Sequence, residues 1–356
     1  MPDVIVVGAG VIGLSIAWRL AQEKITVAVL DSGAAGGQAS TAAAGMLAPG
    51  GEIKRRTEWS QFALDSFRLY PSFVNELQVE SDTSIEFRRC GGVELAYSES
   101  EWARLMERAA TQKLLGVPTD PVTGPPLSSL VPGLELNGLI GAMFYPEDAL
   151  VDPHHLVRAL HAACISREVQ VRQQLPVLGL RFDSGVVEVR TDEGVLRAGA
   201  AVLAAGAWSS SIPIEGAAVP RCGPAKGHLL AYNLDPGSLE PILRHGETYI
   251  LQRSGGFTIA GSSVEDVGFD STVDTAVAAQ IAARARRMLP LPAVPSKVWT
   301  GFRPRTEVGG PQIGRHLDTP LWLAYGHYRN GILMAPGTAA RVASDVIAYL
   351  RSPAAA

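Results

Sequence analysis

The sequence is poor in charged residues, in aromatic residues and in cysteine. Charged residues make up 19% of the 356 positions and aromatic residues 6%, and the three cysteines are Cys90, Cys164 and Cys222. They are odd in number, far apart and without a CxxC pair, which argues against a disulfide framework and against a zinc site. We therefore expect no metal ion, and a reducing, cytoplasmic location fits best.

Long basic stretches and long unbroken apolar runs are also absent. The formal net charge is −4, so neither nucleic acid nor an anionic membrane is expected as a partner. Residues 4–20 are apolar-rich, but no basic region precedes them, and Gly8, Gly10 and Gly13 interrupt them. This run is typical neither of a signal peptide nor of a bilayer span, so we expect no stable membrane insertion.

The chain is rich in apolar residues, which make up 47% of it. A chain of this length and composition can bury a large core and is too long for one simple core, which predicts two interleaved domains. At the N-terminus, Val4–Val7 is typical of a buried parallel strand, Val11–Gln22 has helical spacing of its apolar residues, and 25–30 predicts a second strand. Together they predict a nucleotide-binding βαβ unit of the usual length.

The turn inside this unit reads Gly-Ala-Gly-Val-Ile-Gly at residues 8–13. Gly8 permits a tight turn, Gly10 lets the backbone approach a pyrophosphate, and Gly13 lets helix and strand pack closely. The N–H groups and the dipole of the helix N-terminus favour phosphates. Asp31 ends the next strand and can accept hydrogen bonds from the ribose hydroxyls of an adenosine. A dinucleotide is therefore expected, and at this point both FAD and NAD remain open.

Further elements are predicted along the rest of the chain. Helices are expected at 60–76, 99–115, 152–164 and Gly331–Leu350, and an irregular, proline-rich connection at 118–132. Strands are expected at Val186–Thr191, 195–198, 200–205 and Leu321–Tyr325, and a largely antiparallel second sheet at 228–232, 249–252, 256–260 and 297–302.

Three later segments favour a flavin over a nicotinamide. Small residues at 200–209 would let a strand end pass close beneath a dinucleotide. A glycine-containing turn and a helix start at 326–333 would direct the positive end of a helix dipole to the N1/C2=O edge of a flavin. The run Ala-Ala-Ala-Gly-Met at 42–46 would let an isoalloxazine ring lie against backbone.

With these segments the chain resembles, nearly end to end, the D-amino-acid oxidase family of flavoproteins, and within it the bacterial glycine oxidases of thiamine biosynthesis. The resemblance rests on the glycine turn, on Ser-Thr-Ala-Ala-Ala-Gly-Met-Leu at 40–47, on Trp-Thr-Gly-Phe-Arg-Pro at 299–304 and on Gly-His-Tyr-Arg-Asn-Gly-Ile-Leu at 326–333. It implies an α/β fold: an FAD-binding, Rossmann-like domain of the glutathione-reductase type with an interleaved, largely antiparallel α+β substrate domain. The implied FAD-binding domain comprises 1–84, 150–218 and 303–356, and the implied substrate-binding domain comprises 85–149 and 219–302.

The resemblance also implies an activity. It implies oxidative deamination of glycine or another small amino acid by hydride transfer from Cα to flavin N5, which yields an imino or 2-oxo acid, ammonia and hydrogen peroxide. The expected partners are thus a small amino acid and molecular oxygen, in a homo-oligomer. The sarcosine oxidases that attach their flavin covalently use a cysteine in the C-terminal part of the chain, and none follows Cys222 here, so noncovalent FAD is expected.

Site residues follow from the same resemblance. Asp31 and Ser32 would contact the ribose, and the backbone of Val177 would hold the adenine. The full set expected to bind the cofactor is Gly8, Gly10, Val11, Ile12, Gly13, Asp31, Ser32, Ala39, Ser40, Ala44, Gly45, Met46, Val177, Gly206, His327, Tyr328, Arg329, Asn330, Gly331, Ile332 and Leu333.

For the substrate, the resemblance points to Arg303, Tyr249 and Arg329. A physical argument supports Arg303, because the main handle of a small amino acid is its carboxylate and a guanidinium binds a carboxylate with two hydrogen bonds. Arg329 lies in the turn before the last helix, so pairing with the flavin is an equal alternative. Tyr249 fits an ordinary, partly buried tyrosine just as well. We interpret His327 as a structural hydrogen-bonding group and not as a general base.

Two departures from the glycine-oxidase pattern leave the substrate open. Val264 and Glu247 stand where a methionine and a histidine are expected near the substrate, so sarcosine and larger D-amino acids remain candidates. A dehydrogenase that passes electrons to an acceptor other than oxygen is the alternative enzyme. A non-catalytic nucleotide-binding protein is disfavoured by the joint presence of the three substrate residues, and an NAD-dependent dehydrogenase leaves the C-terminal turn and helix unexplained.

Overall fold

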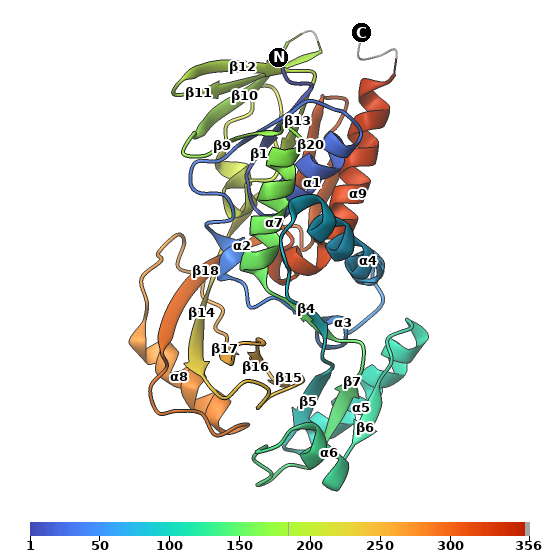
Figure 1. Ribbon diagram of the computed structural model, residues 1–356, viewed down its shortest axis with the longest axis vertical. Coiled ribbons are helices and arrows are strands. Elements are labelled where there is room, and N and C mark those ends of the chain that lie inside the picture. The colour runs from blue at the N-terminus through green and yellow to red at the C-terminus, as the bar shows by residue number, and fades with distance from the viewer. Residues whose placement is uncertain (184, 353–356) are drawn as a thin grey trace.

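The protein is described from a computed structural model that covers residues 1–183 and 185–352. Figure 1 shows an elongated molecule with one large sheet in its upper part and another in its lower part, and with the N-terminus at the upper end. The predicted α/β class, with a Rossmann-like part and an interleaved antiparallel sheet, is confirmed.

The upper sheet has six strands in the order β19-β20-β13-β1-β2-β9, all parallel except that β19 is antiparallel to β20. The strands are β1 (Val4–Val7), β2 (Val27–Leu30), β9 (Gln170–Arg172), β13 (Ala200–Leu203), β19 (Gln312–Arg315) and β20 (Leu321–Tyr325). In β1, Val4 and Val6 join the core on one face of the sheet, and Ile5 and Val7 join the core on the other. This two-sided burial is why the strand is apolar at every position.

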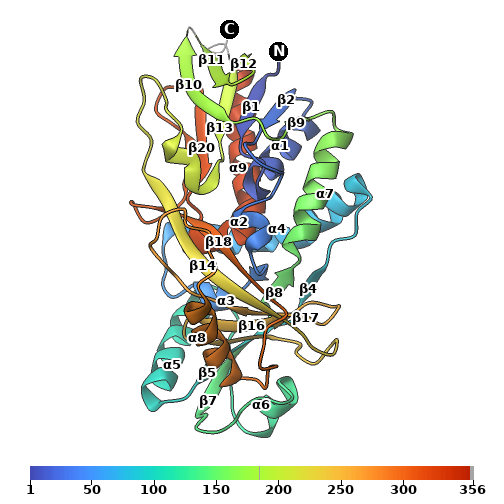
Figure 2. The same ribbon diagram turned by 90° about the vertical axis from the view of Figure 1, so that its left-hand side faces the viewer.

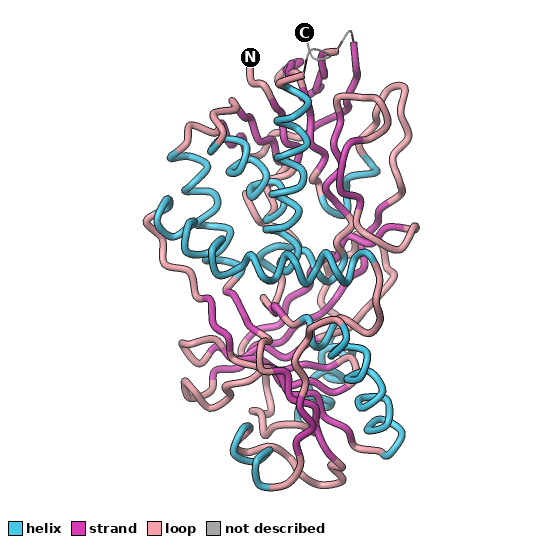
Figure 3. The backbone as a smooth tube through the Cα atoms, turned by 90° about the vertical axis from the view of Figure 1, so that its right-hand side faces the viewer, coloured by secondary structure: helices cyan, strands magenta, loops and turns pink. Residues whose placement is uncertain are grey.

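Different layers cover the two faces of this sheet. Four helices lie on one face and a three-stranded antiparallel sheet lies on the other. The helices are α1 (Val11–Gln22), α4 (Glu58–Ser81), α7 (Pro153–Ser166) and α9 (Gly331–Leu350), and the strands are β10 (Val177–Asp183), β11 (Val186–Thr191) and β12 (Gly194–Ala198). In Figure 3, seen from the side of α4 and α9, the helices of the upper part lie in front of its strands.

The lower sheet has eight strands in the order β18-β14-β17-β16-β15-β5-β7-β6, and every pair is antiparallel except β5 with β15. The strands are β5 (Gly92–Ala96), β6 (Asp120–Val122), β7 (Gly141–Tyr145), β14 (Cys222–Asn233), β15 (Ile242–His245), β16 (Thr248–Gln252), β17 (Phe257–Gly261) and β18 (Lys297–Thr306). The helices that belong to this part are α5 (Glu99–Leu114), α6 (Pro125–Leu130) and α8 (Thr275–Arg286).

A third, small sheet contains β3 (Met46–Leu47), β8 (Ala149–Val151) and β4 (Phe87–Arg89). The remaining elements are short helices: α2 (Ala39–Ala42), α3 (Pro49–Glu52), η1 (Gly206–Ser211) and η2 (Tyr328–Asn330).

The strands β14 and β18 are the longest in the lower sheet, and they lie side by side from the middle of the molecule downwards (Figure 2). The implied domain boundary at 302/303 falls inside β18, which pairs with β14 on both sides of that point. The division of the chain into two domains at the expected boundaries stays a proposal.

The structure corrects several expected elements. The region 118–132 contains β6 and α6 and is not simply irregular. The helix expected at 60–76 spans 58–81; a capping box of Thr57 and Ser60 begins it, and Asp82, with φ 48°, ends it. Helix α8 was not predicted from the sequence. Its buried positions have helical spacing, but three of the four are alanines, so the apolar pattern is weak.

No helix in the described part of the chain is both long enough and apolar enough to cross a bilayer.

Candidate active site

A cavity of about 550 Å³ lies between the two large sheets. The carboxyl ends of β1, β2, β13 and β20 border it from one side, and β14, β16 and β18 border it from the other. Ligands of open α/β sheets bind at such carboxyl ends. The expected cofactor residues that line the cavity are Gly8, Gly10, Val11, Ile12, Asp31, Ser32, Ala39, Ser40, Ala44, Gly45, Met46, Val177, Gly206, His327, Tyr328, Arg329, Gly331 and Ile332, and the expected catalytic residues Arg303, Tyr249 and Arg329 line it too.

Three residues expected to bind the cofactor do not line the cavity. A Cβ on Gly13 would lie 1.9 Å from the carbonyl oxygen of Gly8, so Gly13 serves the contact between helix and turn. Leu333 is buried in the helical core, and the backbone N–H of Asn330 donates to the carbonyl of His327 at 2.9 Å. The part of these three residues in cofactor binding stays a prediction.

The glycine turn leaves backbone N–H groups directed at the cavity end of α1. Gly8 has φ +109°, and a Cβ there would lie 2.4 Å from the carbonyl oxygen of Ala204. In the first turn of α1, the N–H of Val11 donates to Ser40 Oγ at 2.9 Å. The N–H groups of Ile12 and Gly13 have no acceptor among the described residues, which leaves them available to a phosphate.

Asp31 braces this turn. Its Oδ2 accepts the N–H of Ala9 at 2.7 Å, and its Oδ1 accepts the N–H of Gly33 at 2.8 Å. Each carboxylate oxygen has a further lone pair, and Asp31 lines the cavity, so it can accept a ribose hydroxyl as well. The carboxylate therefore has a structural task that the sequence pattern alone did not indicate.

The 42–46 segment is held in place by a buried ion pair. Gly45 has φ +90°, and a Cβ there would lie 1.9 Å from the carbonyl oxygen of Val151. Arg253 donates to the carbonyl of Ala44 at 3.3 Å and to Asp152 Oδ2 at 2.6 Å. Asp152 also caps α7. Sequence reasoning missed Arg253, which lies far from this segment in the chain and belongs to no motif.

Side chains of α4 supply hydrogen bonds to backbone groups in the first turns of α9, whose N-terminus reaches the cavity. Pro336 has no N–H, so the carbonyl of Ile332 lacks its usual donor inside the helix. The Tyr70 hydroxyl donates to that carbonyl at 2.5 Å. Ser66 Oγ donates to the carbonyl of Leu333 at 2.8 Å and accepts the N–H of Gly337 at 3.0 Å. The positive end of a long, intact helix thus faces the cavity.

His327 lies just before this helix and is buried. Its Nε2 is 3.0 Å from Thr338 Oγ1, and burial lowers the pKa of His327 to about 3. The ring is therefore neutral across the physiological range. These contacts agree with a structural role and offer no partner for general-base chemistry.

The buried imidazole predicts acid sensitivity. His327 titrates near 6.5 when unfolded and near 3 when folded, so the unfolded state binds more protons below pH 6.5, and stability is lost as pH falls from 6.5 towards 3. Between pH 7.5 and 5.5 the unfolding free energy of the wild type should fall about 1.4 kcal/mol more than that of His327→Gln. Urea titrations of the two holoproteins at both pH values measure the difference, and equal falls would contradict the prediction.

Arg303 projects from β18 into the cavity. The side chain is half-buried, and its NH1 donates to the carbonyl of Ser263 at 3.0 Å and its NH2 to Ser262 Oγ at 2.9 Å. Within residues 1–183 and 185–352 no carboxylate lies within ion-pairing distance of it. A guanidinium in a cavity that has neutral acceptors only can still bind a carboxylate with two hydrogen bonds.

Arg329 differs from Arg303, because two carboxylates already engage it. NH2 lies 3.3 Å from Glu52 Oε1, and NH1 donates to Glu247 Oε2 at 3.0 Å. Burial acts to lower the pKa of Arg329, but Glu52 and then Glu247 outweigh it and raise that pKa. Glu52 and Arg329 line the cavity, and the Glu247 side chain is 67% exposed at its edge. A ligand carboxylate would compete with these acids for Arg329.

Tyr249 is buried on β16 and lines the cavity near both arginines. Burial raises the pKa of Tyr249 above its usual value, and Arg303 and Arg329 oppose the rise only in part. The phenol therefore keeps its proton and can act as a hydrogen-bond donor to an anion.

The described cavity suits an FAD. At the glycine turn, backbone N–H groups without acceptors can bind the phosphates, and the Asp31 carboxylate, which has free lone pairs, can accept hydrogen bonds from the ribose. Towards the other end lie the small residues of the 42–46 segment and the N-terminus of α9. A Cβ on Gly301 would lie 2.6 Å from Ala42 Cβ, so the two layers approach closely there.

Comparisons of the sequence and of the structure with known proteins find the same kind of protein. A family described as "DAO: FAD dependent oxidoreductase" matches residues 3–344. The chain is similar to a glycine oxidase of Bacillus licheniformis (32% identity, covering 97% of this chain and 93% of that one) and to a bifunctional protein ThiO/ThiG of Trichormus variabilis (33%, covering 99% and 53%). It is also similar to the crystal structure of a glycine oxidase from Geobacillus kaustophilus, with a TM-score of 0.92, 31% identity and coverage of 98% and 95%.

Proposed function

The chain belongs to the DAO family of FAD-dependent oxidoreductases, and on that premise we propose that it oxidises glycine or another small amino acid at the Cα–N bond and passes the electrons to oxygen. The products would be an imino acid, which hydrolyses to a 2-oxo acid and ammonia, and hydrogen peroxide. Relatives named glycine oxidase, similar over nearly the whole chain, support glycine as the first candidate.

One observation carries the proposal. Arg303 is half-buried in the cavity, and its two hydrogen-bond acceptors, on Ser262 and Ser263, are uncharged. A cation removed from water without a counter-ion is costly, and a substrate carboxylate would supply the missing charge. Few small metabolites besides amino acids combine a carboxylate with an oxidisable carbon–nitrogen bond.

The residues around Arg303 complete the arrangement. Bound FAD supplies the acceptor for the two electrons and the hydrogen that leave Cα. Arg303 binds the substrate carboxylate, and the protonated Tyr249 donates a further hydrogen bond to it. Together they restrict rotation of the substrate, so that one Cα–H bond has a defined direction. No side chain needs to remove the α-proton, in keeping with the neutral, engaged state of His327.

The substrate is identified by an anaerobic screen. Glycine, sarcosine and several D-amino acids are added to the purified flavoprotein without oxygen, while the flavin absorbance is followed. Bleaching by at least one of them supports the proposal, and glycine should bleach the flavin faster than the larger D-amino acids. If no amino acid bleaches it, the proposed function is wrong.

A second step of that screen identifies the acceptor. The reduced protein is mixed either with air-saturated buffer or with a quinone, and peroxide is assayed. Fast reoxidation in air with stoichiometric peroxide supports an oxidase. Reoxidation by the quinone alone would replace this part of the proposal with a dehydrogenase. A homo-oligomeric state, a cytoplasmic location and a place in thiamine biosynthesis belong to the same proposal.

In the wild type, the ion pair of Glu247 with Arg329 should weaken the binding of the substrate carboxylate. Its carboxylate partly neutralises Arg329 at the cavity edge, so Glu247→Gln should lower the KM for glycine about two- to five-fold, the range for an exposed ion pair. Steady-state kinetics measure the change. Glu240→Gln is the matched control, because Glu240 is an exposed acid that pairs with Arg88 and does not line the cavity. An unchanged or higher KM in Glu247→Gln would contradict the prediction.

A further inference from the structure

The direction of the Arg303 guanidinium depends on a segment outside the FAD-binding motifs. The residues 262–274, here called the clamp segment, connect β17 to α8. Arg303 donates to Ser262 Oγ and to the carbonyl of Ser263, both at the start of this segment. Since no carboxylate in the described chain engages Arg303, these two acceptors set its orientation before a substrate arrives.

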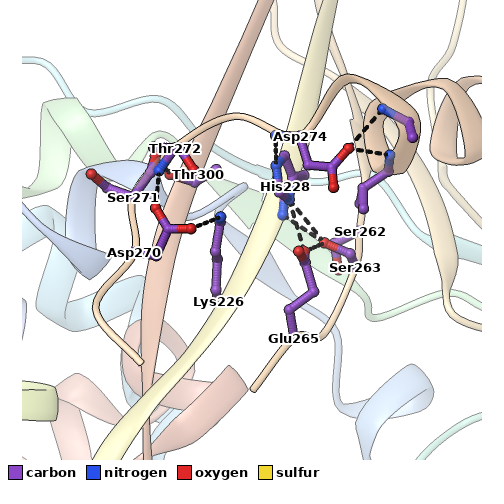
Figure 4. A network of polar contacts seen from close by, with 12 residues as sticks. Lys226, His228, Ser262, Ser263, Glu265, Asp270, Ser271, Thr272, Asp274 and Thr300 are labelled. Carbon is purple, nitrogen blue, oxygen red and sulfur yellow. Dashed lines mark hydrogen bonds and ion pairs between the residues drawn. The ribbon is translucent and has the colours of Figure 1, made fainter. Parts of the chain in front are cut away.

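A partly buried network around one carboxylate holds the start of the clamp segment (Figure 4). Glu265 Oε1 accepts a hydrogen bond from Ser263 Oγ and lies 2.8 Å from His228 Nδ1. Ser263 Oγ also accepts the backbone N–H of His228 at 2.9 Å. Glu265 is tied by its backbone too, through a pair of N–H···O bonds with Lys226 of 2.9 and 3.0 Å.

His228 connects this network to the end of the segment. Its ring is fully buried, and its Nε2 accepts the backbone N–H of Asp274 at 2.8 Å. A nitrogen that accepts this bond carries no proton, which assigns the proton to Nδ1 and makes Nδ1 a donor to Glu265. Asp274 is also the N-cap of α8. One imidazole thus ties both ends of the clamp segment to β14.

The alternation of β14 links this anchor to Arg303. The side chains of Lys226 and His228 lie on the face that meets the clamp segment, and Gly227 between them lines the cavity. A Cβ on Gly227 would lie 2.3 Å from Arg303 NH1, so the guanidinium lies against β14 at this point. Arg303 is therefore confined between Gly227 on one side and the serines of the clamp segment on the other.

We propose that Glu265, His228 and Ser263 are positioning residues for the carboxylate-binding Arg303. They touch neither substrate nor cofactor, and they act by holding the Ser262–Ser263 acceptors at the place that directs the guanidinium into the cavity. The inference rests on the proposed function, because it assigns Arg303 to a substrate carboxylate. It predicts that loosening the network weakens carboxylate binding before it affects anything else.

The test uses holoenzyme variants at two partly buried positions of the clamp segment and at one exposed control position. Glu265→Ala removes the acceptor shared by His228 and Ser263, and Ser263→Ala removes the hydroxyl but keeps the carbonyl that Arg303 uses. Asp266→Ala is the matched control, because Asp266 lies on the same segment, its side chain is 67% exposed, and it pairs with the exposed Arg305 and with no member of the network. Each variant is compared with the wild type in KM and kcat for glycine, and in the Kd for acetate from the flavin absorbance.

For Glu265→Ala we expect a rise of about ten-fold in both the KM for glycine and the Kd for acetate, with kcat and the FAD content within two-fold of wild type. Ser263→Ala should show a smaller rise in the same two constants, and Asp266→Ala should show none. An unchanged KM and Kd in Glu265→Ala overturns the inference. So does a fall in kcat with KM unchanged, or an equal rise in the control.

Failure of the proposed function would look different. In that case glycine and the other amino acids would not bleach the wild-type flavin, whereas acetate binding would still report on Arg303. A higher Kd for acetate in Glu265→Ala than in Asp266→Ala would then support the positioning role by itself, and equal values would refute it.

Discussion

Arg303→Ala should raise the KM for the amino-acid substrate about 10²- to 10³-fold. The side chain offers two parallel donors to a carboxylate inside a cavity. The loss of one partner of such a desolvated pair costs about 2–5 kcal/mol, or about 30- to 5,000-fold in affinity, a range that contains the expected change. Its present contacts are to Ser262 and Ser263, so the alanine variant strands no charged group. Steady-state kinetics with glycine, or with the best substrate of the anaerobic screen, measure the effect.

Two further variants make this prediction specific. Arg305→Ala lies two residues along β18, removes an exposed arginine that pairs with Asp266, and should leave KM within two-fold. Arg303→Lys keeps the charge but not the fork of donors, and its KM should fall between wild type and Arg303→Ala. All three proteins should purify with FAD. A near-normal KM in the FAD-loaded Arg303→Ala protein would remove Arg303 from the substrate site.

Two glycines of the same motif should fail in different ways when alanine replaces them. A Cβ on Gly13 would lie 1.9 Å from the carbonyl oxygen of Gly8, so Gly13→Ala forces α1 away from the turn and should cost about 3 kcal/mol or more of unfolding free energy. A Cβ on Gly10 would meet only Ser40 Oγ, at 3.2 Å, but Gly10 lines the cavity. Gly10→Ala should therefore fold normally and bind FAD about 10²-fold more weakly.

Urea unfolding of the apoproteins and FAD titration separate the two effects. Gly223→Ala is the control, since a Cβ there meets nothing within 4 Å and its φ is not in the left-handed region; it should change neither quantity. If Gly13→Ala unfolds at the wild-type urea concentration, the close approach of helix and turn does not matter for stability. If Gly10→Ala binds FAD like the wild type, the pyrophosphate does not lie against Gly10.

The two arginines of the cavity show how neighbours change the meaning of a residue. Both match positions expected to bind a carboxylate, yet Arg329 already has Glu52 and Glu247, whereas Arg303 has only serine acceptors. Glu52 is placed by the 49–53 turn, where Gly50 donates to Asp148 and accepts from Gln112. This difference is why we propose Arg303, and not Arg329, as the main residue that binds the substrate carboxylate.

The elements predicted correctly from sequence share a physical property. The first strand and the last helix were predicted with the bounds that the structure has. A strand buried on both faces is an unbroken apolar run in the sequence, and an amphipathic helix repeats its apolar residues at helical spacing. Helix α8 was missed because alanines fill most of its buried positions. The repair of α9 by Tyr70 and Ser66 was also missed, since it depends on residues more than 260 positions away in the chain.

The sequence by itself determined the local features: the glycine turn, the strand and helix that flank it, the small-residue run at 42–46 and the presence of an arginine at 303. Each can be recognised from a short stretch of sequence, because backbone conformation and periodicity are local properties. Only the tertiary structure decided which arginine lacks a carboxylate partner, that Asp31 braces the turn, and that His228 and Glu265 lie beside the serines that accept hydrogen bonds from Arg303. Those outcomes depend on side chains brought together by pairing of β14 with β18 and by the return of 262–274, and the energy of a charge is set by its neighbours in space.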